Sequence, residues 1–97
     1  MTNWNIQEVF KALGDGTRLQ IVFDLFKHEE MTSGEIAEKF PAAWGTISRH
    51  LSILKSSGLI LEQRKGRNIY YRVNEGCLSG SLLSFIRKSN LDLKEKK

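Results

Sequence analysis

Residues 43–58 combine an apolar stripe and a polar stripe at the spacing of one helix. Ile47, Leu51 and Leu54 fall on one side, and Gly58 stands where helices commonly end. The other side carries small polar side chains and one long cation. Its members are Gly45, Thr46, Arg49, Ser52 and Ser56, with Ser48 and His50 on its flanks. This pattern predicts an amphipathic helix whose exposed face has a distinct chemistry.

That face is suited to hydrogen bonding with the base edges of DNA. Guanidinium and hydroxyl groups can reach bases in the major groove, whereas phosphate would repel a carboxylate there. The sequence has no carboxylate from Ala43 to Leu61. The pattern therefore indicates a DNA-reading helix. The alternative that it leaves open is a serine-rich helix that faces only water.

Charge is divided unevenly along the chain. Residues 1–48 carry 4 Lys or Arg and 7 Asp or Glu, whereas residues 49–97 carry 11 and 4. Between Arg49 and Val73 the sole acid is Glu62. A basic half on a small domain is the electrostatic pattern of a protein that binds a polyanion.

Two amphipathic helices are predicted near the N-terminus. Residues 4–13 have apolar side chains at helical spacing, and Gly14 ends this run. Asp15 is a suitable N-cap for a second helix over residues 17–27, because its carboxylate can accept hydrogen bonds from the first free amides.

A third helix precedes the DNA-reading helix at close range. Thr32 and Glu35 have the spacing of a capping box, which predicts a short helix over residues 33–39. Two helices joined by a tight turn describe a helix-turn-helix, here over residues 32–57. Ala43 is a weak cap for the second of these helices, and a DNA phosphate is one acceptor for its free amides.

The chain then changes to the pattern of a β-hairpin. Residues 59–64 and 68–73 have strand-like composition, and Gly66 between them supplies a turn conformation. The cations at the tip are Arg64, Lys65 and Arg67. A hairpin over residues 59–73 with a cationic tip is typical of a DNA-contacting wing, and a purely structural hairpin is the alternative.

The first and last helices have more apolar surface than one small core can cover. Asn74 is a candidate cap for a final helix over residues 75–91. Because a domain of this size is near the lower limit for a self-sufficient core, we expect a homodimer in which the helices over residues 4–13 and 75–91 pair. The expected interface residues are Val9, Phe10, Leu13, Leu78, Leu82, Phe85 and Ile86.

Length and composition favour one domain over residues 1–97. No apolar run approaches the roughly 20 residues of a membrane helix, and the N-terminus has no signal-peptide pattern. Cys77 is the single cysteine, which excludes an intrachain disulfide and fits a reducing cytoplasm. Neither Cys77 nor His50 lies near an orienting acid or a glycine-rich segment, so we expect no enzymatic activity.

Several segments resemble the ArsR/SmtB family of winged-helix bacterial repressors. The matching segments are residues 10–18 (FKALGDGTR), 34–38 (GEIAE), 47–51 (ISRHL), 54–55 (LK), 58–60 (GLI) and 64–71 (RKGRNIYY). The resemblance implies a mainly helical winged helix-turn-helix fold with a small β-hairpin. It also implies a homodimer paired through its first and last helices, which represses by binding an imperfect inverted repeat near a promoter.

The family's metal-sensing residues have no counterpart here. Arsenic- and cadmium-sensing members place a Cys-x-Cys pair where this chain has Thr32 and Gly34, and zinc-sensing members use Asp and His pairs on the last helix, whereas no histidine follows His50. We therefore expect neither a metal nor another cofactor. The chain looks most like the sensor-less autorepressors of sporulation-delay toxin operons, which implies relief by an anti-repressor protein.

The expected DNA contacts come from the reading helix and the wing. They are Trp44, Gly45, Thr46, Ser48, Arg49, His50, Lys55, Arg64, Lys65 and Arg67. The expected function is repression of transcription through double-stranded DNA, in the cytoplasm and without membrane insertion. A winged-helix module that binds protein or RNA without reading DNA sequence is the alternative.

Overall fold

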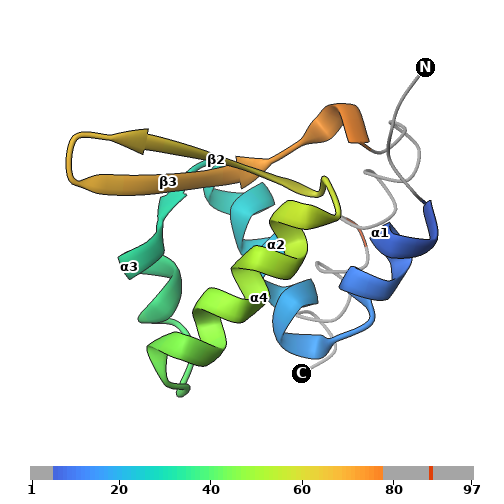
Figure 1. The fold of residues 1–97 in the computed structure, drawn as a ribbon, viewed down its shortest axis with the longest axis horizontal. Coiled ribbons are helices and arrows are strands. Elements are labelled where there is room, and N and C mark those ends of the chain that lie inside the picture. The colour runs from blue at the N-terminus through green and yellow to red at the C-terminus, as the bar shows by residue number, and fades with distance from the viewer. Residues whose placement is uncertain (1–5, 78–87, 89–97) are drawn as a thin grey trace.

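The computed structural model describes residues 6–77 and residue 88. Its elements are α1 (Ile6–Leu13), α2 (Gly16–His28), β1 (Met31–Thr32), α3 (Ser33–Ala37), α4 (Trp44–Ser56), β2 (Ile60–Lys65), β3 (Asn68–Val73) and the 3-10 helix η1 (Glu75–Cys77). Figure 1 shows the β2–β3 hairpin extending to the side of the molecule away from α1. In the described part of the chain, the order of helices and hairpin is the predicted one.

Helix α2 is the central helix of the core. Asp15 caps it as predicted, since its Oδ2 accepts a hydrogen bond of 3.1 Å from the Arg18 backbone amide. The consecutive residues 21–25 are all buried, which shows that neighbours cover α2 on more than one side. Phe23 and Asp24 are among these buried residues, and a pattern with a single apolar face does not describe a helix enclosed in this way.

The helix-turn-helix has the expected two helices. The capping box of α3 is confirmed: the Glu35 amide donates to Thr32 Oγ1 at 3.1 Å, and the Thr32 amide donates to Glu35 Oε1 at 2.8 Å. Helix α3 ends at Ala37, two residues before the predicted end. Beyond it, the amide of Lys39 donates to the Ile36 carbonyl in a tighter turn.

The sheet has three antiparallel strands in the order β1–β3–β2. The hairpin register runs from Ile60 opposite Val73 to Lys65 opposite Asn68, so Lys65 belongs to β2 and not to the loop. Strand β1 was not predicted, because two residues are too few for an alternating pattern. Its pairing of Met31 with Tyr71 depends on a strand that is distant in sequence.

The core is formed by buried apolar side chains from the helices and from the sheet. Helix α4 contributes Ile47, Leu51 and Leu54, all buried, as the spacing predicted. Strand β3 buries Tyr71 and Val73 and half-buries Ile69 and Tyr70. These contacts attach α4 to α1, α2 and β2 and leave its polar side toward solvent.

Asn74, the candidate cap of the predicted final helix, bonds to the residues that follow α4. The side-chain amide of Asn74 donates to the Gly58 carbonyl at 3.0 Å, and its backbone amide donates to the Leu59 carbonyl at 2.8 Å. Asn74 therefore ties the end of β3 to the end of α4. The predicted final helix beyond residue 77, with Leu78, Leu82, Phe85 and Ile86, lies outside the described residues. In the described residues, no helix has the length and apolarity needed to cross a bilayer.

Candidate nucleic-acid interface

The outward face of α4 consists of the residues that the sequence predicted. The exposed residues are Trp44, Gly45, Thr46, Arg49, Ser52, Lys55 and Ser56, and Ser48 is half-buried. The buried Ile47, Leu51 and Leu54 on the opposite side fix the rotation of the helix about its axis. The structure thus presents a polar helical surface backed by a rigid apolar contact.

Arg49 is the one long cation in the middle of this face. In the part of the chain that the structure describes, it makes neither a hydrogen bond nor an ion pair, and its side chain is exposed. Its five donors are therefore available to an external acceptor. A guanidinium in this setting can form a bidentate hydrogen bond with the O6 and N7 atoms of guanine.

The N-terminal end of α4 is open to a ligand. Ala43 has the extended conformation of an N-cap but makes no side-chain capping hydrogen bond. Trp44 is 52% exposed although it is a large apolar residue. A methyl group added at Gly45 would meet open space, so packing within the described residues does not require glycine there. A DNA backbone can therefore approach this end of the helix closely.

The wing carries two cations without protein partners among the described residues. Arg64 and Arg67 are exposed and have no hydrogen bond or ion pair there. Gly66, the first of the two loop residues, has a φ of +63°, the sign that a type II′ hairpin turn requires at that position. The turn therefore holds Arg67 at the far end of the hairpin.

Lys65 is placed differently from its two neighbours. Its Nζ lies 3.5 Å from Glu30 Oε2 and 4.9 Å from the centre of the Tyr70 ring. The sequence suggested a cationic tip without an acid, but the fold brings Glu30 to it from the α2–β1 connection. Lys65 is thus partly neutralised by the protein, unlike Arg64 and Arg67.

Lys55 takes part in a contact that joins α4 to the wing. Its Nζ lies 3.2 Å from Glu62 Oε1, which also accepts a hydrogen bond of 3.3 Å from the Tyr71 hydroxyl. Burial, and then the charge and the hydrogen bond of Glu62, raise the pKa of Tyr71 to about 12. Tyr71 therefore remains a neutral donor at physiological pH, and this contact fixes the wing beside α4.

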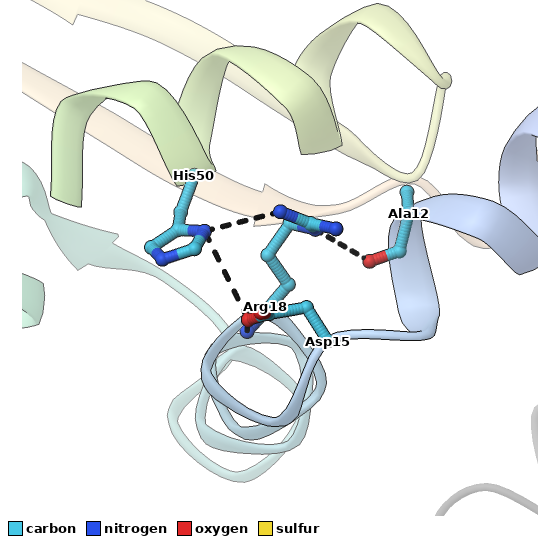
Figure 2. A network of polar contacts seen from close by, with 4 residues as sticks. All are labelled: Ala12, Asp15, Arg18 and His50. Atoms are coloured by element: carbon cyan, nitrogen blue, oxygen red, sulfur yellow. Dashed lines mark hydrogen bonds and ion pairs between the residues drawn. The ribbon is translucent and has the colours of Figure 1, made fainter. Parts of the chain in front are cut away.

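His50, which the sequence places among the expected DNA contacts, has its ring nitrogen Nδ1 directed toward the protein. Its Nδ1 lies 3.2 Å from Arg18 Nη1 and 3.9 Å from Asp15 Oδ2, and its side chain is 16% exposed. Figure 2 shows the imidazole pointing from α4 toward the start of α2. The hydrogen bond from the Arg18 backbone amide, together with the charge of Arg18, lowers the pKa of Asp15 despite some opposing burial. Sequence reasoning gave Arg18 no role beyond the family resemblance.

Helix α1 has one buried and one exposed apolar side. Val9 is completely buried within a single chain, and Leu13 is half-buried against the core. By contrast, Ile6 is 59% exposed and Phe10 is 55% exposed. Val9 thus belongs to the core of one chain, and the exposed apolar side of α1 is formed by Ile6 and Phe10.

Thr32 stands at a position where the family resemblance implies a cysteine in metal-sensing members. Thr32 is occupied in the α3 capping box. Within residues 6–77 and 88, no group of three or more His, Cys, Asp or Glu side chains is arranged to hold a metal ion.

Comparison with known proteins places this architecture in a family. A model of bacterial regulatory proteins of the arsR family matches residues 15–61. The transcriptional repressor SdpR of Bacillus subtilis is 45% identical over 91 residues, which cover 91% of this chain and 100% of SdpR. The chain belongs to the ArsR family.

Another relative resembles this ArsR-family chain in sequence, and a solved structure resembles it in fold. The arsenical resistance operon repressor of Bacillus subtilis is 34% identical over 86 residues, which cover 84% of this chain and 82% of that protein. A homodimeric winged helix-turn-helix DNA-binding domain from Mycobacterium bovis, a possible ArsR-family transcriptional regulator, has a TM-score of 0.70 and 31% identity, covering 93% of this chain and 79% of that one. The predicted family and the winged helix-turn-helix fold are confirmed.

Proposed function

We propose that this protein is a transcriptional repressor that binds an inverted-repeat operator in double-stranded DNA as a homodimer. The observation that carries the proposal is Arg49, an exposed arginine without a partner in the described chain, on a helix face free of carboxylates. In this proposal α4 enters the major groove. Arg49 reads a guanine, and Thr46 and Ser48 contact adjacent bases or phosphates.

The proposal gives the remaining residues positioning roles on the DNA. Trp44 and Gly45 lie where α4 meets the sugar-phosphate backbone, and the free amides of its first turn bind a phosphate. Arg64 and Arg67 contact phosphates or the minor groove from the wing. Lys55 and Lys65 add positive charge nearby, although each also faces a glutamate of the protein.

The domain organisation follows from the same argument. Residues 32–57 form the helix-turn-helix, residues 59–73 form the wing, and residues 4–13 and 75–91 form the dimer interface. The exposed Ile6 and Phe10 support this assignment, because a large apolar side chain in water is unfavourable until a partner covers it. The homodimeric state of the Mycobacterium bovis domain supports it as well.

We also propose that the protein represses its own gene and responds to a protein partner, without sensing a metal and without catalytic activity. Two observations support this. The SdpR repressor is similar to this chain along its full length. The side chain of Thr32 forms the capping box of α3. Relief would then come from an anti-repressor protein that competes for the DNA-binding or dimeric form.

A gel-shift experiment on the DNA upstream of the gene tests the proposal. Random DNA of equal length serves as the control, and both are measured at several salt concentrations. We expect upstream DNA to bind more tightly than random DNA by a factor of at least about 10³ at physiological salt. Equal affinity for both would contradict sequence-specific repression and would favour the interaction-module alternative.

A further inference from the structure

Arg18 connects three helices through its own side chain. Its Nε donates a hydrogen bond of 2.7 Å to the Ala12 carbonyl in the last turn of α1, and its Nη1 lies 3.2 Å from His50 Nδ1 on α4. Its backbone amide donates to Asp15 Oδ2, the N-cap of α2. Figure 2 shows the Arg18 side chain between His50 and the Ala12 carbonyl, with Asp15 beside the imidazole.

The contact between Arg18 and His50 determines the protonation of the imidazole. A guanidinium has hydrogen-bond donors and no acceptor, so Nδ1 of His50 must be the acceptor. The proton of the ring therefore resides on Nε2, and the imidazole is neutral in this arrangement. A protonated imidazole would point a second donor at Arg18, and the contact would become repulsive.

The other charged groups around this site allow an alternative arrangement. Asp15 Oδ2 lies 3.9 Å from His50 Nδ1, close enough to become its partner once the ring is protonated. From α1, Glu8 and Lys11 line an open cavity of about 390 Å³ beside Arg18, together with residues of α4. From β2, Glu62 faces Lys55 and not His50. On α4 itself, Arg49 precedes His50 in the sequence and lies on the exposed side.

We propose that Arg18 and His50 are positioning residues that hold α4 in its DNA-reading orientation, and that this contact exists only while His50 is neutral. The inference rests on the proposed function, because the orientation matters where α4 reads DNA. When His50 gains a proton, it turns from Arg18 toward Asp15, and the link between α4 and the end of α1 is lost. Because His50 is adjacent to Arg49, the change moves the base-reading side chain.

Operator binding at two pH values tests the proposal with a non-titrating variant. His50→Asn is informative because its Oδ1 takes the place of Nδ1 and accepts from Arg18 at every pH. The matched control is His28→Asn, since His28 is the other histidine and is exposed at the end of α2. Random DNA is measured in parallel, because protonation also strengthens binding to any polyanion.

Between pH 7.5 and 5.5, we expect the operator preference of the wild type over random DNA to fall about fivefold, the lower range of allosteric couplings. His28→Asn should show the same loss, whereas the operator preference of His50→Asn at pH 5.5 should equal the preference that the same variant has at pH 7.5. Arg18→Lys, which keeps the charge but cannot reach both Ala12 and His50, should lose operator preference at pH 7.5 while its melting temperature remains close to that of the wild type. Identical pH profiles for the wild type and His50→Asn would overturn the proposal.

An NMR titration of the free protein tests the same contact without DNA. The backbone amide signals of residues 46–52 should follow the titration of the His50 ring in the wild type and remain unchanged in His50→Asn. If the amide signals of residues 46–52 do not change as His50 is protonated, the positioning role is wrong, even if the protein binds its operator. If instead the amides follow His50 and no DNA sequence is preferred, the proposed function is wrong and the positioning contact stands.

Discussion

Arg18 and Arg49 have the same side chain and opposite surroundings. Arg18 has its Nε and one Nη engaged by Ala12 and His50, so its charge is used inside the protein. Arg49 is exposed and has no protein partner in the described chain. A guanidinium binds most strongly when two of its N–H groups donate to one matching acceptor. Of these two arginines, Arg49 has its donors free for such an acceptor on DNA.

Arg49→Ala should weaken binding to the operator by about 1–3 kcal/mol and binding to random DNA much less. The reason is that a bidentate contact with guanine is present only on the correct sequence. Fluorescence anisotropy on labelled operator and random duplexes gives both values. Lys27→Ala, which removes an exposed cation from α2, should change neither. Equal losses on both DNAs would make Arg49 a phosphate contact instead.

At the scale of elements, the connection from α2 to β1 contains a strained turn. Glu29 has φ +66° and ψ −45°, and the Glu30 amide donates to the His28 carbonyl at 2.7 Å across it. This is the rare form of the γ-turn, which an L residue adopts only at a cost. The turn allows β1 to start directly after α2, and it brings Glu30 to Lys65 of the wing.

Glu29→Gly should therefore stabilise the protein. Relief of a positive-φ conformation is worth about 1–3 kcal/mol, and the greater freedom of glycine in the unfolded chain opposes it by about 0.5–1 kcal/mol. A net gain of about 1 kcal/mol would raise the melting temperature by about 4–8 °C in a domain of this size. Glu29→Ala removes the charge but keeps the Cβ atom, so it should give no such increase. Equal increases in both variants would attribute the effect to charge.

The wing should contribute affinity without sequence preference. Replacing Arg67 by Ala should lower the slope of log K against log salt by about one unit, because one phosphate contact is lost. Arg64→Ala should behave similarly. Lys65→Ala should lower the slope less, since Glu30 and Tyr70 already hold its ammonium group. Slopes that stay at the wild-type value in all three variants would show that the wing remains in solvent.

At the scale of the whole molecule, α1 and the wing lie on opposite sides of the core, as Figure 1 shows. Pairing two copies through α1 would therefore leave both wings and both α4 helices free for DNA. A two-fold reader of this type matches half-sites about 34 Å apart, one turn of the double helix. The operator should accordingly be an inverted repeat with that spacing.

Phe10→Asp should dissociate the dimer and abolish operator binding, because it places a charge in an apolar interface. Leu82→Asp on the predicted final helix should have the same effect. Sedimentation at micromolar concentration measures the state of association, and Trp44→Ala is the control for association alone because it alters an exposed aromatic residue away from the interface. If the wild type is a monomer and still binds its operator tightly, both the predicted homodimer and the predicted half-site spacing are wrong.

Metals should leave the repressor unaffected. Operator affinity should stay constant when zinc, cadmium or arsenite is added, and when a chelator is present, because Thr32 and Gly34 offer no thiolate at the positions where the family resemblance implies a cysteine pair in metal-sensing members. Anisotropy titrations at fixed protein concentration check this expectation. A severalfold loss of operator affinity at one metal equivalent would contradict it.

Periodicity and capping chemistry determined most of the elements from the sequence. The apolar stripe of α4, the capping box at Thr32 and the turn at Gly66 are local, since each depends on residues within a few positions of one another. For the same reason the exposed face around Arg49 could be predicted, because a helix with a buried stripe has only one other side.

The tertiary structure decided which groups meet across distant parts of the chain. His50 lies 32 residues from Arg18, Lys65 lies 35 residues from Glu30, and β1 exists because β3 returns beside it. Such contacts depend on how helices and strands pack, and no local spacing encodes them. The fold likewise buries Val9 in the core and leaves Phe10 exposed. The helices that pack against α1 decide which of its sides is covered.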